Sequence, residues 1–225
     1  MEHLRKKEND IFDILQSFID AKLNFIIVGG YAVSSYKHRF SVDADIVIQH
    51  QDLEKFEIIL KKQGFKQTMS RELENIYSSK FIRYDKDTAS IDIMIDALAS
   101  RQTNASFSYD LLLKNSSSRK IIGIEKEIQT IVPSREMLII TKIHSGRLTD
   151  FRDIAALAKD SDVDLIKKLL FVGDIKELNK TLKELNGVVN DSKFKDSFKG
   201  VFLEKKFDID FNKVKQIGEL KVSQA

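Results

Sequence analysis

Short apolar runs bounded by turn residues dominate the chain up to its only proline, Pro133. They predict buried strands at residues 25–30 and 44–49 and antiparallel hairpins at 80–96 and 118–133. Apolar residues spaced three and four apart predict helices at 8–22, 31–38 and 52–64, and residues 100–108 are expected to form a polar loop.

After Pro133 the apolar spacing is helical throughout, with polar or glycine breaks between the segments. The predicted fold class is therefore α+β, with a first domain at residues 1–132 and a helical domain at 133–225. The helical region includes four phenylalanines expected to pack in its core: Phe194, Phe198, Phe202 and Phe207.

Composition narrows the class of protein. The chain has 225 residues, is 42% hydrophobic and 32% charged, and contains no apolar run near the roughly 20 residues that span a bilayer. The charged start MEHLRKKENDIF lacks a signal core, so we expect a cytoplasmic protein and no membrane partner. With no cysteine, any metal must bind oxygen or imidazole ligands.

Charge alone does not indicate a nucleic-acid partner, because the net charge is only +3. The arginines are unevenly distributed, and all nine fall at or before Arg152. Since the planar guanidinium suits phosphate recognition, phosphate chemistry is expected in the first two thirds of the chain.

Two aspartates open the second predicted strand. Asp43 and Asp45 are two residues apart, so their side chains point to the same side of a strand. Like charges this close repel each other, and a divalent cation such as Mg²⁺ or Mn²⁺ relieves the repulsion. The alternative is that both carboxylates are simply solvated at the start of the strand.

Asp92 is a lone carboxylate inside an apolar strand, where burial without a partner is costly. If its strand neighbours that of Asp43 and Asp45, three carboxylates converge, enough for two metal ions acting on a phosphate. Asp96 is the second candidate for this third position, and Asp92 facing solvent is the simpler alternative.

Gly29 and Gly30 end the first predicted strand where a helix is expected to begin. Backbone N–H groups at such a helix start bind phosphate oxygens, and glycine permits close approach. A tight turn with no ligand is the alternative reading.

These motifs together resemble the nucleotidyltransferase superfamily of DNA polymerase β, in which a glycine turn precedes Asp-x-Asp. The sequence RFSVDAD, residues 39–45, is similar to that of minimal bacterial and archaeal enzymes and of AbiEii-type abortive-infection toxins. Members also carry a helical lysine and a downstream Arg-Asp helix, matched by Lys142, Arg152 and Asp153. The resemblance covers residues 24–158. Gly30 departs from it, because many members have a serine there.

The resemblance implies a mixed, mostly antiparallel sheet flanked by helices, and transfer of a nucleoside monophosphate from an NTP to an acceptor hydroxyl. It implies Mg²⁺ or Mn²⁺ as cofactor and, as catalytic residues and metal ligands, Asp43, Asp45 and Asp92. It also implies a set of nucleotide-binding residues: Gly29, Gly30, Ser34, Arg39, Lys142 and Asp153. Ser34 or Ser35 would supply the hydroxyl that Gly30 lacks.

Simpler roles compete for several of these residues. Lys142 and Arg39 are alternatively surface cations, and Asp153 is alternatively the N3 residue of a helix capped by Asp150. His38 and His144 are expected to be incidental.

Two rival functions remain at this stage: a nucleotide- or RNA-binding module without turnover, and a toxin neutralised by an antitoxin partner. The acceptor is open between RNA or a tRNA end, a protein and a small alcohol, and so is the choice of NTP.

Overall fold

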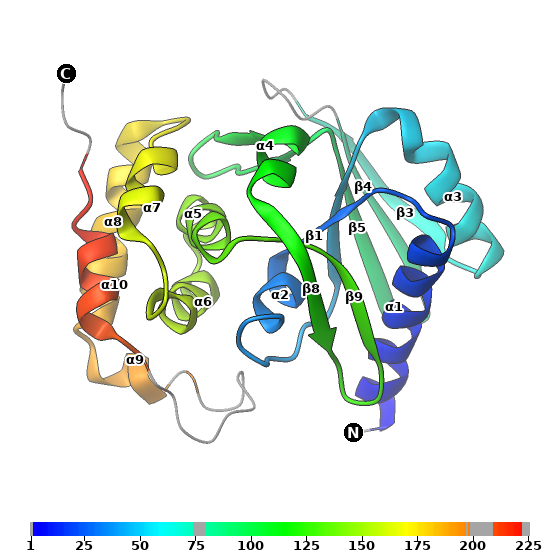
Figure 1. Cartoon of the computed structure of the whole chain (residues 1–225), viewed down its shortest axis with the longest axis horizontal. Helices are drawn as coiled ribbons and strands as arrows, with labels where there is room; N and C mark the ends of the chain where they lie inside the picture. Colours follow the sequence, from blue (N-terminus) through cyan, green and yellow to red (C-terminus); the bar gives the residue numbers. More distant parts are fainter. Residues whose placement is uncertain (1, 74–79, 197, 199–208, 222–225) are drawn as a thin grey trace.

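A seven-stranded mixed sheet forms the centre of the computed structural model, which describes residues 2–73, 80–196, 198 and 209–221 (Figure 1). The strand order is β3-β4-β5-β2-β1-β9-β8. The strands are β1 (Ile26–Val28), β2 (Ala44–Ile48), β3 (Lys66–Glu72), β4 (Lys80–Lys86), β5 (Ala89–Ile95), β8 (Ser116–Ile122) and β9 (Glu127–Pro133). A separate two-stranded sheet pairs β6 (Ala97–Ala99) with β7 (Ser106–Ser108).

Most of the strand pairs are antiparallel, and β2–β5 and β1–β9 are the parallel ones. The predicted mostly antiparallel mixed sheet is confirmed. The parallel pairing of β2 with β5 matters most here, because it brings together two strands that lie far apart in the sequence.

Helices lie on both sides of the sheet in Figure 1, with α1 and α3 on the right and the C-terminal helices on the left. The first four helices are α1 (Glu2–Asp20), α2 (Gly29–Ser34), α3 (Leu53–Lys62) and α4 (Tyr109–Lys114). The C-terminal region contains α5 (Arg135–Ser145), α6 (Leu148–Ala158), α7 (Val163–Leu170), α8 (Ile175–Val189), α9 (Ser192–Asp196) and α10 (Phe211–Gly218). No helix in the described ranges is both long and apolar enough to cross a bilayer.

One continuous apolar core runs from the sheet into the C-terminal helices. At one end Phe18 of α1 packs edge-to-face on Phe56 of α3, with ring centroids 4.7 Å apart. At the other, fully buried side chains of α5, including Ile139, belong to the same cluster as Ile46 of β2. The predicted change to helix after Pro133 is confirmed, whereas a domain boundary there stays a prediction.

Several elements differ from those predicted. The strand expected at residues 25–30 stops at Val28, because Gly29 already begins α2. Residues 100–108 are not entirely loop, since β7 occupies the end of that segment. The predicted hairpins are confirmed as β4–β5 and β8–β9.

The phenylalanines of the last helical segment are only partly described. Phe194 and Phe198 are buried and stack edge-to-face, with ring centroids 5.1 Å apart, which confirms their packing role. Phe202 and Phe207 lie outside the described residues.

Candidate active site

The strand register brings the predicted carboxylates onto one face of the sheet. Asp45 of β2 is the direct partner of Asp92 of β5 in the parallel pair, and Asp43 precedes Asp45 by two residues. Paired positions on neighbouring strands point to the same face, so Asp45 and Asp92 do so. Asp43 stands just before β2, and its Oδ2 lies 3.5 Å from Arg83 Nη2 of β4. Asp92 is only 5% exposed, so the prediction that it faces solvent is wrong.

Gly29 brings the backbone against these carboxylates. Its φ of 66° lies in the left-handed region, and a β-carbon there would fall 2.0 Å from Asp45 Oδ2. At Gly30 a β-carbon would fall 2.2 Å from Ser41 Oγ. Both glycines are therefore required by close approach, which a tight turn alone would not demand.

No cation directly contacts the Asp45 carboxylate in the described part of the chain, although Lys142 and Arg147 oppose the rise of its pKa from a distance. Within the described part of the chain it has no hydrogen-bond or ion-pair partner. Burial and, secondarily, the charges of Asp43 and Asp92 raise its pKa to about 7. A carboxylate in this setting favours any positive charge placed beside it.

Asp92 has such a charge, supplied by Arg83 of β4. Arg83 Nε donates to Asp92 Oδ1 and Nη2 donates to Oδ2, each at 2.6 Å. The same Nη2 lies 3.5 Å from Asp43 Oδ2. Burial raises the pKa of Asp92, and the Arg83 guanidinium opposes this rise.

The cluster only partly fits a divalent metal ion. The unpaired Asp45 and the neighbouring Asp43 offer the hard oxygen donors that Mg²⁺ and Mn²⁺ prefer. However, both oxygens of Asp92 bind Arg83, and the described residues contain no group of three or more potential ligands arranged to hold a metal. Asp96 lies at the other end of β2, where its Oδ1 accepts a hydrogen bond from the His50 N–H at 2.8 Å.

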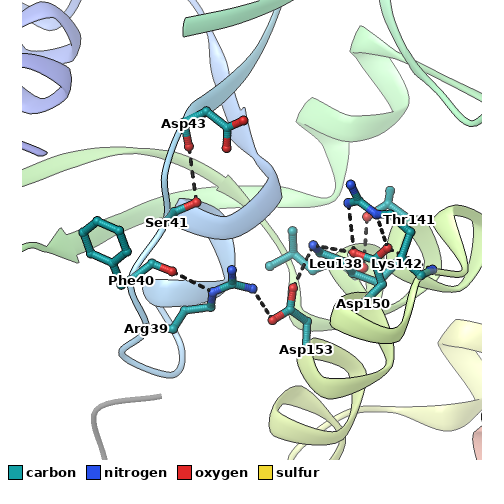
Figure 2. A network of polar contacts seen from close by, with 10 residues as sticks. Arg39, Phe40, Ser41, Asp43, Leu138, Thr141, Lys142, Asp150 and Asp153 are labelled. Atoms are coloured by element: carbon teal, nitrogen blue, oxygen red, sulfur yellow. Dashed lines mark hydrogen bonds and ion pairs between the residues drawn. The ribbon is translucent and has the colours of Figure 1, made fainter. Parts of the chain in front are cut away.

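Asp43, Asp45, Asp92 and Arg83 form the first charged cluster. A second charged cluster lies beside it, between α2, α5 and α6 (Figure 2). Lys142 Nζ lies 2.9 Å from Asp150 Oδ1 and 2.8 Å from Asp153 Oδ2. Asp153 also binds Arg39, and Asp150 accepts from Arg147 Nε at 2.7 Å. Figure 2 shows Arg39 and Lys142 reaching Asp153 from opposite sides. These five side chains form a continuous row of alternating charges.

A cavity of about 440 Å³ opens between the two clusters. Its size is in the range of small-molecule sites. It is lined by Gly29 and Asp45, by Lys142, Arg147 and Asp150, and by residues 98–102 and Phe107. The cavity therefore joins the carboxylates to basic side chains.

Two solved structures share this arrangement of strands and helices. The solution structure of the antibiotic-resistance factor ANT(2'')-Ia aligns with a TM-score of 0.53 and 13% identity, covering 72% of this chain and 88% of that one. Its crystal structure with adenylyl-2''-tobramycin gives 0.52 and 13%, covering 76% and 95%. The chain has the nucleotidyltransferase fold.

Other comparisons add no family. A Helicobacter pylori protein aligns over 97% of this chain and 90% of its own, with a TM-score of 0.49 and 14% identity. No protein-family model and no curated protein matches the sequence. At these identities the likeness shows the nucleotidyltransferase fold but not the reaction.

The simpler roles considered for Lys142, Asp153 and Arg39 do not match the burial and helix positions of these residues. Lys142 is 7% exposed, so the surface reading is wrong. Asp153 lies inside α6, where it is fully buried, and Asp150 is the N3 residue, accepting from the Arg147 backbone N–H at 3.2 Å. The alternative with Asp150 as N-cap and Asp153 as N3 is therefore wrong. Arg39, with its side chain 15% exposed, is no surface cation either.

The predicted nucleotide contact of Ser34 has no direct support in the geometry. Ser34 Oγ donates to Tyr31 O within α2 at 2.8 Å, and Ser35 Oγ donates to Ala32 O at 2.8 Å. The hydroxyl beside Gly30 belongs to Ser41 instead. Sequence reasoning missed Ser41, although it stands two residues before Asp43 in the quoted motif.

Arg83 and Arg147 were also missed. An arginine on a strand or before a helix carries no spacing signal, and only the β4–β5 register reveals that Arg83 faces Asp92. His144 has a structural role: its Nδ1 lies 2.7 Å from Thr103 Oγ1 and its Nε2 lies 2.9 Å from Leu170 O.

Proposed function

We propose that the protein transfers a nucleoside monophosphate from an NTP to an acceptor hydroxyl and releases pyrophosphate. The observation that carries the proposal is the contact between the Asp45 carboxylate and the Gly29 backbone at the wall of the cavity. It places a carboxylate pair beside backbone amides and basic side chains, a combination suited to a metal-bound triphosphate.

Asp43 and Asp45 would hold a divalent ion, Mg²⁺ or Mn²⁺. When bound, such an ion supplies neutralisation of phosphate charge and Lewis-acid activation of the phosphoryl group. In the reaction the hydroxyl oxygen bonds to the α-phosphorus, the bond to the pyrophosphate oxygen breaks, and the hydroxyl proton passes to a base or to water. The cavity walls orient the two reactants for in-line attack.

The chain's own residues would bind the nucleotide in two ways. Gly29 and Lys142 line the cavity, where phosphate oxygens would bind, and the amide of the buried Gly30 follows directly in α2. Asp153 and Arg39 act indirectly, because they fix Lys142 through the charge row, and Ser34 supports α2 through its bond to Tyr31.

The acceptor is proposed only as a class, a hydroxyl of RNA, of a tRNA end, of a protein or of a small molecule. One structural neighbour was solved with adenylyl-2''-tobramycin, a nucleotidylated small molecule, which favours the last of these. From the AbiEii-type motif we further propose that the protein is a cytoplasmic toxin with an antitoxin partner. Growth arrest on expression, rescued by a neighbouring gene, would support this role, and harmless overproduction would contradict it.

The test supplies each α-³²P-labelled NTP in turn with Mg²⁺ and separate RNA, protein and metabolite fractions. We expect label in one fraction with wild-type protein and none with Asp43→Asn/Asp45→Asn. Asp110→Asn, an exposed carboxylate on α4, is the matched control and should retain transfer. Transfer by the double variant, with an unchanged circular dichroism spectrum, would refute the assignment.

A further inference from the structure

We propose that Arg83 is a built-in cation of the carboxylate cluster, so that the site takes one divalent ion and not two. The proposal rests on the proposed function and deepens it. In it, Asp43 and Asp45 hold the ion, while Asp92 positions the Arg83 guanidinium. Asp92 is thus a positioning residue and not a metal ligand.

The strand register places Arg83 at this site. β4 and β5 are antiparallel, with Arg83 directly opposite Asp92, so both side chains point to the same face. The guanidinium binds both Asp92 oxygens at 2.6 Å, the bidentate geometry that Arg and carboxylate form best. Its Nη2 lies 3.5 Å from Asp43 Oδ2. Arg83 therefore bridges Asp92 and Asp43, across the gap that a second ion would have to enter.

The balance of charge agrees with a single ion. When all three carboxylates are ionised they carry a charge of −3, and Arg83 contributes +1 because a guanidinium does not deprotonate in proteins. One divalent ion neutralises the remainder.

Among the described residues, the cations of the second cluster form no ion pair with the three carboxylates. Lys142 is bound by Asp150 and Asp153, and Arg147 is bound by Asp150. With Arg39, the second cluster has three cations and two carboxylates, a net charge of about +1 that lies outside the first cluster. Arg83 is the cation that directly contacts the carboxylates of the first cluster among the described residues.

A second ion would have to displace this guanidinium. The Asp92 side chain is 7% exposed and both of its oxygens are bound by Arg83, so an entering ion must compete with the guanidinium. Binding of an ion to Asp92 would break its two charge-assisted hydrogen bonds with Arg83. We therefore expect Arg83 to keep a second ion away from Asp92. This exclusion should be lost when the charge of Arg83 is removed.

The experiment counts Mn²⁺ ions bound to the full-length protein by electron paramagnetic resonance of the free ion. Binding to Asp43→Asn/Asp45→Asn is subtracted as the adventitious background. We expect one ion for wild type, two for Arg83→Gln, and one for Arg83→Gln/Asp92→Asn, in which the freed carboxylate is also removed. Wild-type protein that binds two ions, or Arg83→Gln that binds one, overturns the proposal.

Thermal unfolding provides a second readout if Arg83→Gln is unstable without metal. Added Mn²⁺ should raise the melting temperature of Arg83→Gln more than that of wild type or of Arg83→Gln/Asp92→Asn, and equal shifts in all three would overturn the proposal. Labelled transfer by wild-type protein separates the two proposals. Transfer together with two bound ions removes only the role of Arg83, whereas no transfer and no bound ion removes the proposed function as well.

Discussion

The carboxylate of Asp45 packs directly against the backbone of Gly29, which leaves no room for a β-carbon between them. Gly29→Ala would add both this clash and a left-handed alanine, which alone costs about 1–2 kcal/mol. We expect a loss of stability and a decrease in nucleotidyl transfer of at least about 100-fold, because Asp45 must move.

Gly64→Ala is the matched control for this prediction. Gly64 has φ of 86°, and a β-carbon there meets nothing within 4 Å. It should lose about 1–2 kcal/mol of unfolding free energy, measured with urea, and retain transfer. Equal activity of the two variants would show that the contact with Asp45 is unimportant.

The raised pKa of Asp45 predicts an unusual pH dependence of metal-free protein. Its pKa is about 7 in the folded state against an ordinary 3.8, so the folded state binds more protons between these values. This group therefore destabilises the fold progressively as pH rises from about 4 to 7. Asp45→Asn should melt higher than wild type at pH 8 but not at pH 4, and saturating Mg²⁺ should reduce the difference.

Removing the cation at the centre of the second cluster should be costly. Lys142→Met leaves Asp150 and Asp153 buried with one partner fewer, and breaking such a pair costs about 3–5 kcal/mol. Lys142→Met/Asp153→Asn should cost less than the sum of the two single variants, measured by urea unfolding. Additive costs would mean that the two side chains are not coupled.

His144 should make the fold sensitive to acid. Burial lowers its pKa from 6.5 to about 4, although the Leu170 carbonyl opposes the shift. The unfolded state then binds the extra proton, so stability is complete above pH 6.5 and decreases toward pH 4 by up to about 3 kcal/mol. His144→Gln should show a flatter slope of unfolding free energy across this range, and an unchanged slope would contradict the prediction.

Local patterns in the sequence predicted most of the elements, because strand alternation and helical spacing are properties of neighbouring residues. β3 is an instructive exception. All seven of its residues are exposed, so it has no apolar face to reveal it, and it is a strand because it pairs with β4. β7 buries Phe107 but has only three residues, and it too is defined by its pairing, with β6.

The site was predicted in part for a related reason. Asp43, Asp45 and the glycines lie close together in the sequence and were recognised by their spacing. The partner of Asp92 depends on a register between strands, so the sequence suggested a metal where the structure has Arg83. Lys142 and Asp153 were singled out from the resemblance, and their mutual contact follows from the packing of α5 on α6.

The apolar core continues without interruption from the sheet into α5 and the helices beyond it. A fragment ending at residue 132 would leave buried side chains of β9, such as Val132, facing water. The two parts are therefore expected to unfold together. The C-terminal helices cannot be exchanged as an independent module unless the replacement also supplies the apolar side chains that α5 packs into the core of the sheet.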